Sequence, residues 1–314
     1  MLQLFILFLF FFRIDAQTYI YPGIYGDELS DLIINEYSTS TTLGYSSARD
    51  TMYSIIDSNN GLVSCIYTDF SVNLIPGTDP SITMYEGGIN CEHSWPQSMG
   101  AGTEPMKSDL HHLFPCKENV NSSRGNNPYS DIVDDYTDSW FYLDQMLNSI
   151  PEQNIINNYS ESHTSSSNDS FEPKENSKGN ISRAMFYFNT IYQSVADQSF
   201  FDLQKDILFE WHYNDIANQV ETNRTWMIAS YQDDIPNPFV IDPTLAWRIY
   251  FINSHPIGDT NSDQEIDILD IVLIANEILN MNNLSGLQKH QSDLNADFTI
   301  NVLDILFVVN MIIG

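Results

Sequence analysis

Residues 89–129 read INCEHSWPQSMGAGTEPMKSDLHHLFPCKENVNSSRGNNPY, and this stretch decides how the whole sequence is interpreted. It contains three of the seven histidines. Its polar residues fall into three short blocks, Asn90-Cys91-Glu92-His93, Asp109-Leu110-His111-His112 and Val120-Asn121-Ser122-Ser123-Arg124. A neutral imidazole takes a proton from water near pH 7, and carboxylate and amide oxygens suit Mg²⁺. Phosphodiester hydrolysis with one metal ion would use these residue types.

The blocks resemble the bacterial endonuclease I family, secreted or periplasmic nucleases of the ββα-metal (His-Me finger) group. The resemblance lies in a Glu-His pair followed by a proline, in Asp-Leu-His followed by Leu-x-Pro, and in Val-Asn before an Arg and an Asn. It implies that His93 is the general base and that Glu92 and Asn121 bind Mg²⁺ or Mn²⁺. It also implies that His111 is a supporting residue on a second strand.

The sequence departs from the family in the loop after the first block. Some members have a phosphate-binding arginine there, but residues 94–108 contain no Arg. Lys107 or Arg124 are the candidates to replace it. A rival interpretation makes His93, His111 and His112 the ligands of a zinc hydrolase, and a second rival is a catalytically silent nuclease fold that acts as an extracellular, calcium-dependent binding protein.

The net charge of −30 argues against a general nucleic-acid binder, because affinity for a polyanion comes largely from neutralising its phosphates. The basic residues are unevenly distributed, however. Of the 12 Lys and Arg residues, several lie between residues 107 and 183, whereas Lys289 is the only one after residue 248. We therefore expect a local cationic groove on an acidic body.

The N-terminal run LQLFILFLFFF at residues 2–12 is too short to cross a bilayer as a helix, which takes about 20 residues. With Ala16 at a plausible cleavage point, it predicts a signal peptide at residues 1–16 and no membrane span in the mature chain. The protein is then secreted, to the extracellular space or the periplasm. Export permits disulfides, and a bridge from Cys91 to Cys65 or Cys116 would brace the site, but the sequence does not choose a pairing. The alternative is that all three cysteines are small buried thiols.

The predicted fold class is α+β, with a ββα-metal core surrounded by helices in a nuclease domain at residues 17–252. Glu92 and His93 should end one strand, residues 109–115 should form its antiparallel partner, and Asn121 should begin the crossing helix. The resemblance continues in Phe-Glu-Pro at 171–173 and Lys-Gly-x-x-x-Arg-Ala at 178–184. The polar residues 151–170 predict a flexible surface insert. Glu221 and Arg224, three apart on a helix, predict a structural ion pair.

A 34-residue internal repeat follows, in which oxygen donors recur with the spacing of a twelve-residue calcium loop. The loops begin at Asp259 and at Asp293, and each precedes an apolar helical segment. We expect one Ca²⁺ in each loop. The expected ligand residues are Asp259, Asn261, Asp263, Glu265, Asp267 and Asp270 in the first loop and Asp293, Asn295, Asp297, Thr299, Asn301 and Asp304 in the second.

Residues 257–314 resemble a type I dockerin, which implies a small all-α module that binds a cohesin-like protein or a cell-surface partner. Loop position 6, usually Gly, is Gln264 or Phe298, so we expect either a strained turn there or a reduced affinity for calcium. The sequence as a whole predicts a secreted Mg²⁺-dependent endonuclease that cleaves DNA, with RNA left open. As the resemblance implies, its products would carry a 5′-phosphate.

Overall fold

The computed structural model describes residues 19–164, 169–297 and 299–314, so the expected signal peptide lies outside the described residues. The fold is a mixture of helices and small antiparallel sheets, which confirms the predicted α+β class. Within these residues, no helix combines the length and the apolarity needed to cross a bilayer. The helices are α1 (Gly26–Tyr37), α2 (Tyr45–Thr51), α3 (Pro80–Glu86), α4 (Glu118–Arg124), α5 (Lys178–Ile191), α6 (Gln198–Asp202), α7 (Lys205–Asn214), α8 (Gln219–Ala229), α9 (Pro238–Ile241), α10 (Ile268–Ile278), α11 (Gly286–Ser292) and α12 (Val302–Ile313).

The strands form three separate sheets rather than one continuous layer. One sheet has the order β1-β2-β3, a second is the pair β4-β5, and the third has the order β7-β6-β8-β9. Their bounds are β1 (Ser58–Asn59), β2 (Leu62–Ser64), β3 (Ser71–Asn73), β4 (Ile89–His93), β5 (Leu113–Lys117), β6 (Ser139–Tyr142), β7 (Gln145–Leu147), β8 (Ser160–His163) and β9 (Ser170–Glu172).

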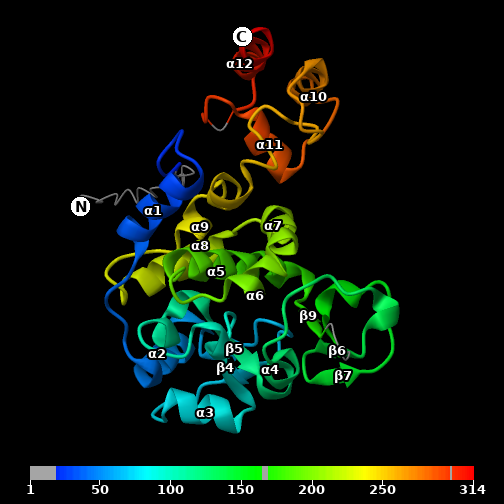
Figure 1. Cartoon of the computed structure of the whole chain (residues 1–314). Helices are drawn as coiled ribbons and strands as arrows, with labels where there is room; N and C mark the ends of the chain where they lie inside the picture. The colour runs from blue at the N-terminus through cyan, green and yellow to red at the C-terminus, as the bar shows by residue number, and fades with distance from the viewer. Residues whose placement is uncertain (1–18, 165–168, 298) are drawn as a thin grey trace, which may run out of the picture.

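Helix α5 runs through the middle of the molecule, with the β4-β5 pair below it and α7, α8 and α9 above it in Figure 1. Nearly all of its residues are buried, so it is a core helix rather than an amphipathic surface helix. Gly179 in its first turn is required by close packing, since a Cβ atom there would lie 1.9 Å from the Asp215 carbonyl oxygen. Trp95, which follows β4, stacks on Phe188 of α5 at 4.7 Å between ring centroids. The helix is therefore the support against which the candidate site is built.

Strands β4 and β5 are antiparallel, with Glu92 opposite Phe114 and His93 opposite Leu113, and α4 follows β5 without a loop. The predicted order of strand, strand and helix is therefore present. The second strand is displaced from the predicted range 109–115, because residues 110–112 form a 3₁₀ turn. The side chain of Asp109 caps this turn by accepting from the His111 N–H. His111 consequently lies before the strand, and its predicted place on the strand was wrong.

The segment predicted as a flexible insert, residues 151–170, is in part a structural element. Residues 160–163 form β8, which lies between β6 and β9 in the third sheet. The polar side chains of β8 are buried because they find partners: Ser160 Oγ donates to the Tyr67 carbonyl oxygen, and Glu161 accepts from the Thr137 hydroxyl. Hydrogen bonding, rather than apolar surface, orders this strand. Residues 165–168 lie outside the described residues.

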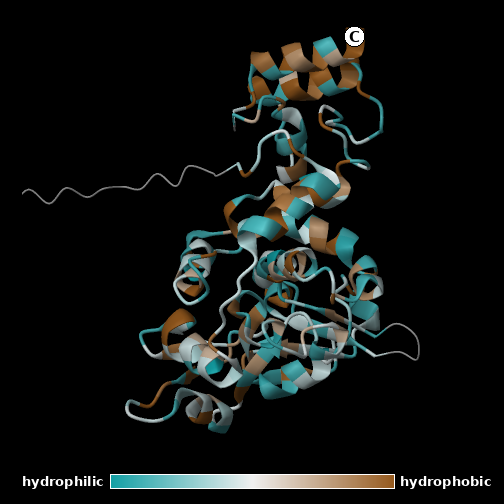
Figure 2. Ribbon diagram, turned by 60° about the vertical axis from the view of Figure 1, so that its left-hand side comes forward, coloured by the Kyte–Doolittle hydropathy of each residue, from teal (hydrophilic) through white to brown (hydrophobic). Residues whose placement is uncertain are grey.

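The C-terminal module consists of α10, α11 and α12 and lies at the top of the molecule in Figure 1. Helices α10 and α12 pack side by side, with Ile274 and Val308 fully buried. Both helices are rich in apolar residues, as the brown ribbon at the top of Figure 2 shows. Their exposed apolar residues include Val272, Leu306, Phe307, Met311 and Ile313.

Helix α11 attaches this module to α7 of the rest of the molecule, residues 19–252, which we call the larger part. The rings of His290 and Tyr213 lie 5.5 Å apart. A Cβ atom on Gly286 would meet the Tyr213 carbonyl oxygen at 3.1 Å, so the two helices approach closely where α11 has no side chain. Beside this contact is a pocket of about 470 Å³ whose lining includes Phe209, Tyr213 and Leu287.

Candidate functional site

Glu92 lies near the end of β4, with its side chain almost completely buried. Its Oε1 accepts a hydrogen bond of 2.9 Å from the Tyr67 hydroxyl, which also lies 2.7 Å from the Tyr129 hydroxyl. Burial raises the pKa of Glu92 to about 7, although Arg124 and Tyr67 oppose the shift. The carboxyl group is thus poised to lose its proton near neutral pH.

Arg124 ends α4 and is buried beside Glu92, with Nε 3.5 Å from Oε1. Its Nη2 donates to the Ser94 carbonyl oxygen at 2.6 Å, and its Nη1 donates to the carbonyl oxygen of Gly125. The guanidinium also lies over the Tyr129 ring at 4.7 Å. Arg124 therefore joins the end of α4 to the end of β4, and it is 1% exposed, which is a poor position for binding a phosphate from solvent.

His93 is the last residue of β4, and its ring faces a different set of neighbours. Nε2 lies 3.0 Å from the Lys107 carbonyl oxygen, and the exposed Gln97 amide lies 3.3 Å from Nδ1. A carbonyl oxygen only accepts, so Nε2 carries the proton and Nδ1 keeps the lone pair. Burial, with a contribution from His112, lowers the pKa of His93 to about 3. The imidazole is therefore neutral at physiological pH and presents Nδ1 as its basic atom.

Asn121 lies on α4 and faces β4. Its Nδ2 donates to Asn90 Oδ1 at 2.7 Å and to the Cys91 carbonyl oxygen at 3.3 Å. Asn90 and Glu92 are two residues apart on a strand and so leave its same face, whereas His93 leaves the other face. The structure thus brings Glu92 and Asn121 to one side of β4. In the described part of the chain, no hydrogen bond joins either of them to His93.

His111 and His112 are held by backbone oxygens. His111 Nε2 lies 3.0 Å from the Ile235 carbonyl oxygen, and its ring packs on Tyr187. His112 Nε2 lies 2.6 Å from the Met106 carbonyl oxygen, and its ring centroid is 5.5 Å from that of His93. Among the described residues, no three His, Cys, Asp or Glu side chains gather as a metal site would require. The zinc cluster of His93, His111 and His112 is therefore not assembled.

Several neighbours of the site carry no signal in the sequence. Tyr67 reaches Glu92 from a distant segment, and Tyr45 of α2 lies 5.5 Å from the His93 ring. Asp109, part of the second block, proves to be a buried acceptor for the hydroxyls of Tyr187 and Tyr192. Only their contacts in the folded molecule identify these residues.

The order of these blocks along the chain matches a known family pattern. A model of the endonuclease I family matches residues 26–244, more than half of the chain. The chain belongs to the endonuclease I family. A second model, the dockerin type I domain, matches residues 257–313 of this endonuclease I family member.

Two curated relatives bear the same printed description, extracellular ribonuclease. The one from Bacillus subtilis (strain 168) is 26% identical over 260 residues, which cover 75% of this chain and 79% of that protein. The one from Bacillus amyloliquefaciens is 26% identical over 179 residues, 52% of this chain and 54% of that protein. The first of these alignments extends along most of the chain.

The two loops of the C-terminal module fold in the same way. In the first loop, Asp259 accepts from the N–H groups of Asp263 and Gln264, and Asp270 accepts from those of Asn261 and Asp267. Gln264 takes a φ of +71°, so the expected unfavourable backbone at loop position 6 is present.

In the second loop, Asp293 accepts from Asp297, and Asp304 accepts from Leu294 and Asn301. Phe298 lies outside the described residues. In both loops the last carboxylate, Asp270 or Asp304, is fully buried.

The three cysteines are free thiols in this structure. Cys65 Sγ and Cys116 Sγ lie 3.9 Å apart in the buried core, and the Ile66 N–H donates to the Pro115 carbonyl oxygen beside them. The predicted pairing of Cys91 with Cys65 or Cys116 is therefore not the one that the fold favours, because Cys65 and Cys116 lie next to each other. The geometry favours Cys65 and Cys116 as the pair that an oxidising environment would join.

Proposed function

We propose that this protein is a secreted, metal-dependent endonuclease that hydrolyses phosphodiester bonds in DNA and RNA. Family membership supports a nuclease, and both curated relatives are described as extracellular ribonucleases. RNA therefore stands beside DNA as a substrate to be tested. In this proposal β4, β5 and α4 are the His-Me finger unit of the protein.

The hydrogen bond from His93 Nε2 to the Lys107 carbonyl oxygen carries the proposal. It fixes the tautomer in which Nδ1 is unprotonated, and burial keeps the ring neutral. His93 then acts as the general base, taking a proton from the attacking water at Nδ1. The exposed Gln97 amide beside Nδ1 marks the side from which that water arrives.

The oxygen donors on the other face of β4 fit a hard divalent cation. Glu92 offers a carboxylate, and Asn121 and Asn90 offer amide oxygens, a ligand set typical of Mg²⁺ or Mn²⁺. Such a cation lies across β4 from His93, so both act on one phosphodiester only if the scissile phosphate spans the end of β4. In that position the cation would stabilise the charge gained by the phosphate and by the leaving 3′ oxygen. Arg124 positions Glu92 by its ion pair and, through the Ser94 carbonyl, positions the end of β4.

The C-terminal module is, in this proposal, a calcium-dependent docking unit. The dockerin match implies a cohesin-type partner, and the exposed apolar faces of α10 and α12 supply a surface for it. The loops offer oxygen ligands only, as Ca²⁺ prefers. The two fully buried carboxylates, Asp270 and Asp304, face no Lys or Arg in an ion pair within the described residues, so their charge fits a bound cation.

A nicking assay tests the proposed function. The full mature chain is incubated with supercoiled plasmid and, separately, with a structured RNA, in the presence of Mg²⁺ and Ca²⁺. We expect cleavage of nucleic acid that EDTA abolishes, and a loss of at least about a hundredfold in turnover for His93→Ala. His112→Ala, which removes the neighbouring ring, serves as the comparison. Cleavage by His93→Ala at the parental rate would refute the assignment of the base.

One observation favours a second candidate, a silent nuclease fold that only binds. The Glu92 carboxylate already accepts from Tyr67 and is paired with Arg124, so a cation would have to compete with both. Calorimetric titration with Mg²⁺ or Mn²⁺ separates the candidates, with Glu92→Gln as the control. If neither ion binds and neither substrate is cut, the silent candidate replaces the enzyme.

A further inference from the structure

Most basic side chains of this acidic protein form ion pairs with carboxylates. Within the described residues, Arg49, Lys107 and Lys117 are the exceptions. The ion-paired side chains are Arg124, Lys174, Lys178, Arg183, Lys205, Arg224, Arg248 and Lys289. Because acidic residues outnumber basic ones 42 to 12, a cation without a carboxylate partner is an unusual feature of this chain.

Two of these exceptions lie on one aromatic ring. The guanidinium carbon of Arg49 is 4.8 Å from the centre of the Tyr45 ring, and Lys107 Nζ is 5.0 Å from the same centre. That ring lies 5.5 Å from the ring of His93. The third exception, Lys117, lies at the opposite end of the β4-β5 pair, where it is opposite Ile89.

Arg49 Nε is buried and has no hydrogen-bond partner, although Arg49 as a whole is partly exposed. A buried N–H without an acceptor costs free energy, and so does holding two positive charges near one ring. A phosphate that contacts the exposed parts of both side chains offsets the repulsion between their charges. Its oxygens accept from the fork of the guanidinium and from the ammonium group.

We propose that Arg49 and Lys107 bind a backbone phosphate of the nucleic acid next to the bond that is cut. This inference rests on the proposed function, since it takes His93 as the reacting residue. It also accounts for the missing loop arginine, because Lys107 comes from that loop and Arg49 comes from α2, which packs against the 3₁₀ turn Met106–Ser108.

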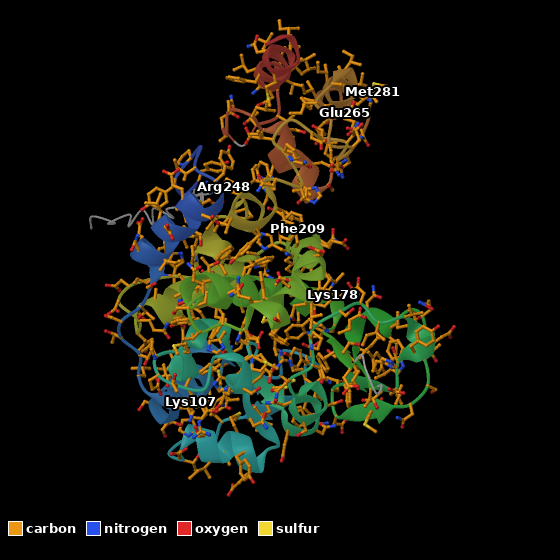
Figure 3. All side chains as sticks on the ribbon, in the orientation of Figure 1. Lys107, Lys178, Phe209, Arg248, Glu265 and Met281 are labelled. Atoms are coloured by element: carbon orange, nitrogen blue, oxygen red, sulfur yellow. The ribbon has the colours of Figure 1, made fainter. Side chains whose placement is uncertain are left out.

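The surrounding structure holds this site in place. The Lys107 backbone carbonyl bonds His93, so the loop that carries the cation also orients the candidate base. Figure 3 labels Lys107 in the lower part of the molecule, well away from Glu265 and Met281 of the C-terminal module. The proposed phosphate site therefore lies in the larger part of the molecule and not in the C-terminal module.

The test compares Arg49→Gln, Arg49→Lys and Lys107→Gln with Lys117→Gln as the matched control. Binding of a fluorescein-labelled DNA duplex to each full mature chain is measured by anisotropy in Ca²⁺ without Mg²⁺, over a series of salt concentrations. Cleavage of the same duplex with Mg²⁺ gives kcat and KM. Melting curves establish that each variant is folded.

We expect Arg49→Gln and Lys107→Gln each to weaken binding about tenfold. Each should also reduce the slope of log K against log salt by about 1, the effect of losing one phosphate contact. KM should rise more than kcat falls, and Arg49→Lys should lose less than Arg49→Gln. Lys117→Gln should stay within about twofold of the parent.

The outcomes separate this inference from the proposed function. If the parent cuts the duplex and the two Gln variants bind and cut it as the parent does, the phosphate site is refuted and the nuclease stands. If the parent binds the duplex without cutting it and Arg49→Gln weakens that binding, the site stands and the nuclease fails. A parent that does neither refutes both.

Discussion

The larger part of the molecule and its C-terminal module differ in how they compensate buried carboxylates. In the larger part, some buried acids have an arginine partner, as in Asp242 with Arg248 at 2.7 Å and Glu221 with Arg183, whereas Asp109 and Glu161 accept from side-chain hydroxyls. In the module, Asp270 and Asp304 are equally buried but accept only from backbone N–H groups. Their charge has no counterpart from the chain itself among the described residues.

This difference indicates where each part obtains the positive charge that compensates its buried carboxylates. A buried charge without a partner is strongly destabilising, so we expect the module to take a cation from solution. The loops offer oxygen ligands only, and metal binding and folding are then one event. The larger part carries its own cations and should fold without calcium.

Removing calcium should produce the largest effect. With EGTA we expect the module to unfold while the larger part remains folded, because free Ca²⁺ at a thousand times its Kd contributes about 4 kcal/mol. Scanning calorimetry and far-ultraviolet circular dichroism, with and without EGTA, measure this. The double variant Asp270→Asn/Asp304→Asn should reproduce the effect in excess Ca²⁺. Identical melting in both conditions would remove the contrast between the two parts.

Breaking a buried ion pair of the larger part should have the second-largest effect on stability. Arg248, labelled in Figure 3, is fully buried and donates to Asp242 and to the carbonyl oxygens of Ile20 and Tyr21. Arg248→Ala leaves a buried carboxylate alone, at a cost of about 3–5 kcal/mol. Urea unfolding of the larger transition measures the loss. A change below about 1 kcal/mol would mean that this pair does not support the fold.

Acid should affect the contact between the two parts through His290. Burial, reinforced by Arg248, lowers its pKa to about 4, and Tyr213 is the ring that it faces. Between pH 6.5 and pH 4, His290 therefore binds a proton more readily in the unfolded chain than in the folded chain. The stabilising contribution is fully present above pH 6.5 and is lost as the pH falls through 4.

Comparing Tm at pH 7 and pH 4.5 for the parent and for His290→Asn isolates the contribution of His290 protonation to stability. The parent should lose roughly 5–10 °C more than the variant, which corresponds to about 2.5 kcal/mol. Loss of calcium in acid affects both proteins and cancels in the difference. Equal losses would show that His290 does not titrate within the contact.

The smallest effect should come from the one ion pair that the described part of the module contains. Lys289 Nζ lies 3.6 Å from Glu277, and the Lys289 side chain is 45% exposed. Lys289→Ala should change stability by less than about 1 kcal/mol, because water screens such pairs. Melting in 0.05 M and 0.5 M NaCl checks this. A loss as large as that of Arg248→Ala would erase the distinction between buried and exposed pairs.

The sequence predicted what depends on neighbours along the chain. The strand that ends at His93, the helix that carries Asn121, and the two loops with their apolar helices all follow from short motifs and periodicity. It failed where polar residues found distant partners. Glu221 and Arg224 do not pair with each other, since Glu221 binds Arg183 and Arg224 binds Asp57.

The same reason explains two further misses. Ser160 and Glu161 look like loop residues, and only their hydrogen bonds to Tyr67 and Thr137 make them part of a buried strand. Arg49 has no motif around it and becomes notable only when the fold places it on Tyr45 near His93. Contacts between residues far apart in the chain leave no periodic trace in the sequence.

The narrow attachment at Gly286 has a consequence for how the protein would work while held in place. Helix α11 touches α7, on the opposite side of α5 from the β4-β5 pair, as Figure 1 shows. A large protein bound to the outer faces of α10 and α12 would sit at the far end of the molecule. It would leave the approach to His93 open, so an immobilised copy could still accept long polymers from the surrounding medium.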